Sequence, residues 1–134
     1  MGNMNIQNYG QDKEIVQGDG FYESGKVTIA ANGDVVQGDL LARDRNGSGK
    51  FIPYTGIAVS GLIDPICAIY TGREKLEGGS SGKDVPLTAY IAGPVDGSKI
   101  KVAGTAATAL QKDLAKTAGI IPVTITEMNS TDNQ

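Results

Sequence analysis

The chain contains no histidine and no tryptophan, and its 134 residues include one cysteine and two phenylalanines. Without histidine, Ser-His-Asp and Cys-His catalytic arrangements and the zinc or iron sites that depend on imidazole are excluded. A single cysteine, Cys67, cannot form an intrachain disulfide. Because large aromatic side chains are scarce, the core must be built from Val, Ile, Leu and Ala.

Phosphate-binding and nucleic-acid-binding signals are also missing. Residues 20–26 match the first seven positions of a phosphate-binding loop, but Val27 stands where Ser or Thr would hold Mg²⁺, and a strand pattern follows. The net charge is −3 and no basic stripe occurs, which works against binding a phosphate backbone. The 15 acidic residues show no metal-loop spacing. We therefore expect no enzymatic activity, no cofactor, no metal site and no nucleic-acid partner.

Long apolar runs are absent as well. No segment approaches the 18 apolar residues that a membrane-spanning helix needs, so we expect no membrane partner. The first residues lack the basic region and apolar stretch of a signal peptide, and we expect no secretion.

Glycine, in contrast, is abundant, with 19 copies, and most of the chain consists of short apolar segments separated by turn residues. Residues 85–91 alternate strictly between apolar and other side chains, which predicts a half-buried strand. Asn32-Gly33 predicts a hairpin turn after a strand at 26–30. Residues 57–59 and 65–70 predict two more apolar strands.

One helix is predicted near the C-terminus. Thr105 can cap it, Gly119 can end it, and its apolar residues recur every four positions at Ala106, Leu110, Leu114 and Ala118. We expect this apolar face to dock on the sheet. The predicted fold is α+β but mostly β: a small antiparallel barrel-like or sandwich-like body with one short helix and an extended N-terminal arm.

The chain divides into three predicted parts: a flexible arm at 1–24, a β-rich domain at 25–127 and a polar tail at 128–134. The first part is polar, with scattered apolar residues that follow no helical or strand period, so it is either a frayed terminus or an arm that becomes ordered on a partner. Its aromatic and aliphatic residues favour the arm. The candidate binding residues are Ile6, Tyr9, Ile15, Val16, Phe21 and Tyr22.

The order of blocks in the body resembles the lambda-type head decoration proteins of phages. The blocks are residues 25–32 (GKVTIAAN), 37–41 (QGDLL), 49–54 (GKFIPY), 85–93 (VPLTAYIAG) and 114–120 (LAKTAGI). Together they cover about a hundred residues, and the order and spacing carry the resemblance. The chain departs from the family pattern after Gly93, where Pro94-Val95-Asp96 follows.

The resemblance implies a homotrimer on the outer surface of a phage capsid, made in the host cytoplasm, with the major capsid protein as its partner and an N-terminal arm that orders on the shell. Its role would be to stabilise the shell by many symmetric contacts. Two alternatives stay open. One is another phage structural component, such as a tail or fibre protein. The other is a small carbohydrate-binding, ligand-binding or enzymatic domain that uses carboxylates.

Overall fold

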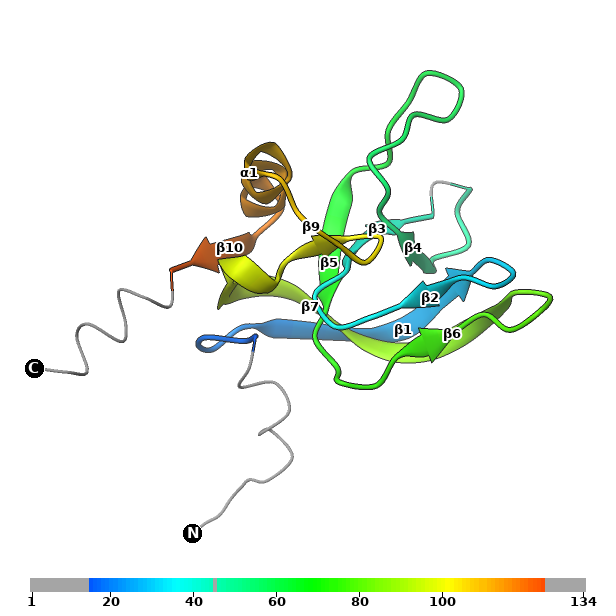
Figure 1. Ribbon diagram of the computed structural model, residues 1–134, viewed down its shortest axis with the longest axis horizontal. Helices are drawn as coiled ribbons and strands as arrows, with labels where there is room; N and C mark the ends of the chain where they lie inside the picture. The colour runs from blue at the N-terminus through cyan, green and yellow to red at the C-terminus, as the bar shows by residue number, and fades with distance from the viewer. Residues whose placement is uncertain (1–14, 45, 125–134) are drawn as a thin grey trace, which may run out of the picture.

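The computed structural model describes residues 15–44 and 46–124. Short strands dominate this part of the chain, and Figure 1 shows them wrapped around one centre with a single α-helix at one side. In chain order the elements are β1 (Phe21–Ile29), β2 (Asp34–Val35), β3 (Leu40–Arg43), β4 (Phe51–Pro53), β5 (Ile66–Tyr70), β6 (Leu76–Glu77), β7 (Lys83–Asp96), the 3₁₀ helix η3 (Gly97–Lys99), β8 (Lys101–Val102), β9 (Thr105–Ala106), α1 (Ala109–Thr117) and β10 (Ile120–Val123).

Five strands close into a barrel. The hydrogen-bonded order is β1-β4-β3-β5-β7, and β7 returns to pair with β1, with Val27 opposite Val85. The closing pair and most of the others are antiparallel, whereas β1 with β4 and β7 with β10 are parallel. The predicted fold class is therefore confirmed: a mostly β body, closed as a barrel, with a short helix near its C-terminal end.

The barrel interior holds one of two apolar clusters. Val27 and Ile29 of β1 are buried, while the residues that alternate with them, Lys26 and Thr28, are exposed. Since side chains on a strand alternate between its two faces, the cluster on the buried face fills the barrel. Its other buried members are Val35, Leu41, Phe51, Ala68, Tyr70 and Ala89. Val85, Leu87 and Ile91 pack against the same cluster, so the predicted alternation of residues 85–91 is confirmed.

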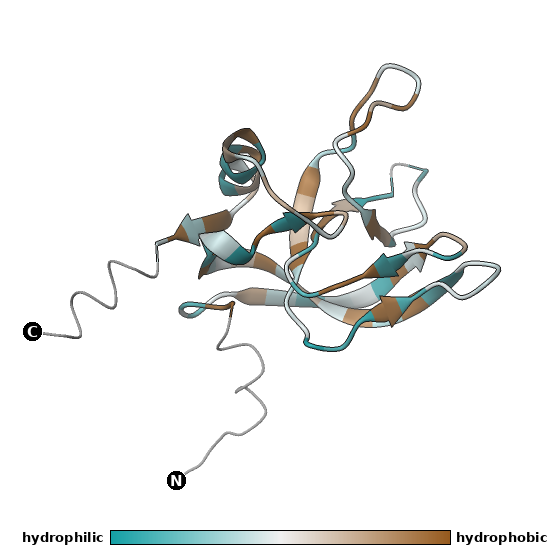
Figure 2. Cartoon of the chain, in the orientation of Figure 1, coloured by the Kyte–Doolittle hydropathy of each residue, from teal (hydrophilic) through white to brown (hydrophobic). Residues whose placement is uncertain are grey.

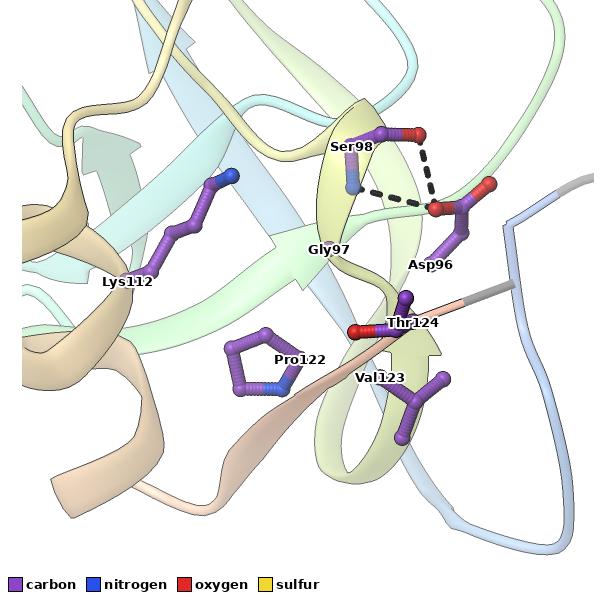
Figure 3. A pocket seen from close by; sticks show the side chains of 7 residues that line it. All are labelled: Asp96, Gly97, Ser98, Lys112, Pro122, Val123 and Thr124. Carbon is purple, nitrogen blue, oxygen red and sulfur yellow. Dashed lines mark hydrogen bonds between the residues drawn. The ribbon is translucent and has the colours of Figure 1, made fainter. Parts of the chain in front are cut away.

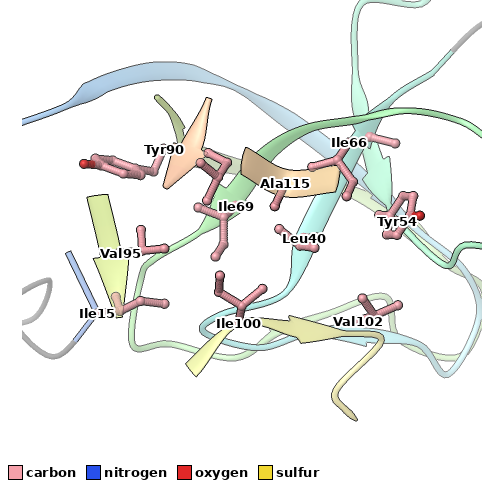
Figure 4. Packing of buried hydrophobic residues seen from close by; sticks show 12 residues of the cluster. Ile15, Leu40, Tyr54, Ile66, Ile69, Tyr90, Val95, Ile100, Val102 and Ala115 are labelled. Carbon is pink, nitrogen blue, oxygen red and sulfur yellow. The ribbon is translucent and has the colours of Figure 1, made fainter. Parts of the chain in front are cut away.

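The second apolar cluster, which we call the outer cluster, lies between the barrel wall and the C-terminal segments (Figure 4). Leu40, Ile69 and Tyr90 face outward from three barrel strands. Ile100 and Ile120 from the C-terminal part of the chain cover them. This layer fixes η3, β8, β9, α1 and β10 on one side of the barrel, and each of these elements is too short to be stable alone.

The helix differs from the prediction at its start and in its packing. It begins at Ala109 with Thr108 as its cap, and Gln111 completes a capping box, because Thr105 and Ala106 form β9 instead. Ala115 is its buried residue, while Leu110 and Leu114 are exposed. The expectation that the leucine face docks on the sheet was therefore wrong, and this face has no cover within the described part of the chain.

Two predicted local pairings also differ. The chain turns at residues 30–33, with Asn32 at φ 61°, but the next strand, β2, pairs with β6 and not with β1. Residues 57–59 form no strand and belong to an exposed loop in which Val59 and Leu62 bridge each other. The local signals identified the turn and the apolar run correctly, but the strand after the turn pairs elsewhere in the chain, and the apolar run is an exposed loop with one local bridge.

One buried carboxylate joins two distant turns. Asp39 is almost fully buried, and its Oδ2 accepts a hydrogen bond from the Val36 amide at 2.9 Å. Its Oδ1 accepts another from the Gly104 amide, also at 2.9 Å, in the turn between β8 and β9. Each carboxylate oxygen thus accepts a hydrogen bond from one backbone N–H, and the side chain links the β8–β9 hairpin to the start of β3.

A second carboxylate, on the barrel surface, provides a test by pH. Asp84 accepts hydrogen bonds from Lys50 Nζ at 2.6 Å and Thr28 Oγ1 at 2.8 Å, and these two contacts lower the pKa of Asp84 below its ordinary 3.8. A carboxylate with a lowered folded-state pKa stabilises the fold above its unfolded-state pKa, and that contribution is lost as the pH falls through the folded-state value. Asp84→Asn should therefore lower the free energy of unfolding at pH 7 and have a progressively smaller effect as the pH falls below the ordinary 3.8.

The measurement is urea unfolding of both proteins at pH 7 and at about pH 2.5. Because Asp84 and Lys50 both lie at the surface, we expect only a small difference in the free energy of unfolding between the two proteins at pH 7. An effect of Asp84→Asn that is equal at the two pH values would contradict the assignment.

Candidate functional site

The predicted binding residues separate into three groups. Ile6 and Tyr9 lie outside the described residues. Ile15 and Val16 belong to the body. The Ile15 side chain is fully buried in the outer cluster, its carbonyl accepts a hydrogen bond from the Asp96 amide at 2.7 Å, and Val16 bridges Val95. The structure therefore holds Ile15 and Val16 against the end of β7, and their predicted place in a flexible arm is corrected.

The two aromatic residues Phe21 and Tyr22 begin β1, so the predicted boundary after residue 24 falls inside a barrel strand. Phe21 is 71% exposed. Tyr22 is 43% exposed and its ring meets the Tyr90 ring edge to face, with centroids 5.0 Å apart. Of the six predicted binding residues, these two are exposed on the described surface, and they lie on a rigid strand.

Tyr90 holds the first described residues in place. Its ring is fully buried and packs against the backbone at Gly20 and Gly93, where a Cβ atom would lie about 2.1 and 2.0 Å from the tyrosine oxygen. The hydroxyl donates a hydrogen bond to the Pro94 carbonyl at 3.3 Å. Burial, with Asp19 nearby, raises the pKa of Tyr90, so the hydroxyl stays a donor at neutral pH. Only glycine leaves room for this ring beside the chain.

The first and last described residues lie at one side of the molecule, on the two edges of β7. Val16 lies beside Val95 on one edge of β7, while Pro122 and Val123 of β10 pair with Val95 and Asp96 on the other edge. Figure 1 shows the start of the described chain and β10 on the same side of the barrel. We call this surface the base: residues 15–17, 94–98 and 120–124.

A hollow of about 330 Å³, lined by both polar and apolar groups, opens in the base (Figure 3). Asp96, Gly97 and Ser98 form one wall, Lys112 reaches in from α1, and residues 122–124 form the other wall. The Asp96 Oδ1 accepts hydrogen bonds from the Ser98 amide at 3.0 Å and the Ser98 hydroxyl at 2.8 Å. These contacts are those of a 3₁₀-helix cap, so the Asp96 carboxylate and the Ser98 hydroxyl are already used in a local structural role.

The base also carries an open strand edge. In the described part of the chain, β10 pairs with β7 and has no strand on its other edge. An unpaired edge can accept an extended peptide through main-chain hydrogen bonds. Pro122 removes one N–H from this strand, which shortens the usable edge. Ile121 is partly exposed beside it.

A second candidate surface was not predicted from the sequence. The aliphatic loop, residues 55–65, projects from the barrel (Figure 1), and four of its large side chains are exposed. They are Ile57, Val59, Leu62 and Ile63. Figure 2 shows hydrophobic residues in this loop and on α1. The signal that could have found it is the pair of apolar segments around Ser60-Gly61, where a surface hairpin would normally alternate with polar residues.

The described residues contain no group of three or more metal-ligating side chains, and among them no helix is long and apolar enough to cross a membrane. Neither a family model nor a curated protein matches the chain. Two surfaces remain as candidate functional features: the base with its exposed strand edge and the projecting aliphatic loop.

Proposed function

We propose that the chain is a decoration protein that binds the outer surface of a phage capsid as a homotrimer and stabilises the shell. The observation that carries this proposal is the base. Ile15 and Val16 fix the start of the body beside β7, and β10 brings the end of the body to the same surface. The described body therefore begins near Ile15 and ends near Thr124 at one side, and a protein seated on a shell through an N-terminal arm needs that arm to start at the surface that faces the shell.

The partner of the base is the major capsid protein. Residues 1–14 act as the arm, with Ile6 and Tyr9 as its apolar contacts, and Phe21 adds an exposed aromatic surface on β1. The arm binds an exposed strand edge of the shell, because an extended peptide gains main-chain hydrogen bonds and places alternate side chains in pockets. Three arms in one trimer act together, so weak single contacts sum to strong binding.

The five sequence blocks that resemble decoration proteins support the proposal. Four of them fall on barrel strands and the turns beside them, in β1, β3, β4 and β7, and the fifth covers the end of α1 and the start of β10, which pack on the barrel wall. A tail or fibre component is the alternative, and the radial position of the protein in images of the virion distinguishes it.

Deletion of residues 1–14 tests the arm. The variant should keep its fold and lose at least about a hundredfold in affinity for empty cognate capsids, measured by co-sedimentation and saturation of the shell. The cut is placed before Ile15 because removing residues 1–24 would also take a core residue and the first four residues of β1. Such a variant could lose binding simply by unfolding.

The matched control is deletion of residues 128–134, which should bind as the full chain does. Bound copies at saturation should number a multiple of three for each shell. Unchanged affinity after deletion of residues 1–14 would refute the arm, and failure of the full chain to bind cognate capsids would refute the decoration function.

A further inference from the structure

Helix α1 leaves its apolar face uncovered. Leu110 and Leu114 are one turn apart, so they share a face, and both are exposed although Ala115 beside them is fully buried. Together with the four exposed side chains of the aliphatic loop, they make six large aliphatic residues whose exposed fractions lie between 45% and 70%. Isolated exposed aliphatic residues are ordinary on soluble proteins, but a group on one side indicates a contact surface.

A groove joins the helix to the loop. It has a volume of about 470 Å³ and is almost entirely apolar, with Ile63 and Pro65 of the loop on one wall and Leu114 and Ala118 of the helix on the other. Tyr54 and Ile66 form its floor. The groove is therefore continuous with the outer apolar cluster, and a side chain that enters it reaches the packed core.

The tip of the loop is a preformed knob. Val59 and Leu62 exchange two backbone hydrogen bonds, at 2.7 and 3.1 Å, around Ser60 and Gly61. Both central residues have positive φ, 55° and 81°, the geometry of a type I′ hairpin turn. Residues 55–63 include no charged side chain. A rigid, uncharged aliphatic knob loses little conformational entropy when it binds an apolar groove.

We infer that this face is the contact between copies of the chain, with the aliphatic loop of one protomer seated in the groove of the next. Knob and groove are both aliphatic, and neither offers a charged group with which a foreign partner could be selected. A fully exposed aliphatic side chain presents roughly 60–120 Å² of apolar area, and the six are 45–70% exposed, so together they present about 200–450 Å². One head-to-tail contact joins the four loop residues of one protomer to the two helix residues of the next, so this area is the apolar centre of an interface of about 1,600 Å² counted over both partners, with a polar rim.

The contact is head-to-tail, because the knob and the groove are different surfaces. A head-to-tail contact that is repeated closes into a ring when the rotation allows it, and three copies make the smallest such ring. The choice of three copies rests on the proposed function; the contact itself does not. Figure 1 shows the loop projecting from a different side than the start of the described chain and β10, so a ring of this kind leaves the base free for a shell.

Two substitutions test the contact by separate means. Leu62→Glu places a charge on the knob and leaves the groove intact, while Leu114→Glu places one in the groove and leaves the knob intact. Burying an unpaired charge at an interface is costly, so each should weaken self-association at least about thirtyfold, the change typical of a hot-spot residue. Sedimentation equilibrium should give the mass of a trimer for the full chain and of a single protomer for either variant.

Mixing the two variants is the sharper experiment. The intact knob of Leu114→Glu can enter the intact groove of Leu62→Glu, so the mixture should form a one-to-one dimer although each variant alone is monomeric. A symmetric loop-to-loop contact predicts no dimer, because one of its two loops would carry the charge. Absence of the dimer would therefore overturn the head-to-tail assignment.

Phe21→Glu is the control for self-association, since Phe21 is an apolar residue that is 71% exposed on β1; because Phe21 belongs to the proposed capsid-binding surface, this variant is compared by mass alone. It should leave the mass unchanged. Circular dichroism and thermal unfolding confirm that each variant is folded. A monomeric full chain, or variants that keep the full-chain mass, would overturn the inference. Variants that remain trimers but lose capsid binding would also overturn the inference, because the loop would then contact the shell and not another copy of the chain. Capsid binding is measured on the full chain and the Leu62→Glu and Leu114→Glu variants, so failure of the self-association inference can be told apart from failure of the decoration function.

Discussion

Replacing Tyr90 with alanine is expected to lower the free energy of unfolding by about 3–5 kcal/mol, the usual cost of truncating a fully buried aromatic side chain. The ring lies in the outer cluster, and it is also the contact that holds the backbone near Gly20 and the ring of Tyr22. Domains of this size are stable by about 5–15 kcal/mol, so the variant loses a large part of its stability. Urea unfolding followed by circular dichroism measures the loss.

Tyr90→Phe is the matched control. It keeps the ring and removes the hydroxyl that donates to Pro94, so its cost should be about 0.5–1.5 kcal/mol. The two variants thus separate packing from hydrogen bonding. If Tyr90→Ala cost no more than Tyr90→Phe, the ring would not be supporting the segment beside Gly20.

Replacing Asp39 with alanine should cost about 2–6 kcal/mol. Both carboxylate oxygens accept backbone hydrogen bonds in a site that is almost fully buried. Removing them leaves two N–H groups without these partners, and each buried unpaired group costs about 1–3 kcal/mol. The turn before β3 and the β8–β9 hairpin should loosen together, because this side chain bonds to both; the backbone hydrogen bond from Lys101 to Gly38 remains between them.

Hydrogen exchange at the Val36 and Gly104 amides gives the direct measurement: both should lose protection in Asp39→Ala. Asp34→Ala is the control, since Asp34 is an exposed aspartate whose distance to Lys75 Nζ is 3.8 Å. Exposed pairs of this kind contribute about 0–1 kcal/mol. Protection that is lost at Val36 and kept at Gly104 would show that the carboxylate does not join the two turns.

The sequence pattern predicted the barrel strands well where burial on one face repeats along the chain. Residues 85–91 show this, because alternate positions meet the same interior. The sequence pattern failed where contacts with a distant part of the chain determine the local structure. The spacing of Leu110 and Leu114 correctly places them on one helix face, but spacing carries no information on what covers that face. Asn32-Gly33 likewise identifies a turn and not the strand that pairs after it.

The candidate surfaces were predictable to different extents. Ile15 and Val16 lie in a polar stretch without a period, and their burial depends on contacts with β7 about eighty positions along the chain. The groove joins Tyr54 and Leu114, which no local pattern relates. The aliphatic loop was visible as apolar residues, but the same residues read equally well as a strand. Exposure, which separates the two interpretations, is a property of the whole fold.

Strand β7 has a consequence for how the molecule is made. It pairs with β1, β5, β10 and Val16, so the barrel seam and the base both depend on it. A ribosome must therefore synthesise the chain through Asp96 before the barrel can close, and through Val123 before the base is complete. Contacts between residues so distant in sequence make folding slow, and the growing chain must keep four barrel strands soluble until the fifth arrives. The proposed head-to-tail contact can form only later, because its groove also needs Leu114 and Ala118, which follow β7 in the chain.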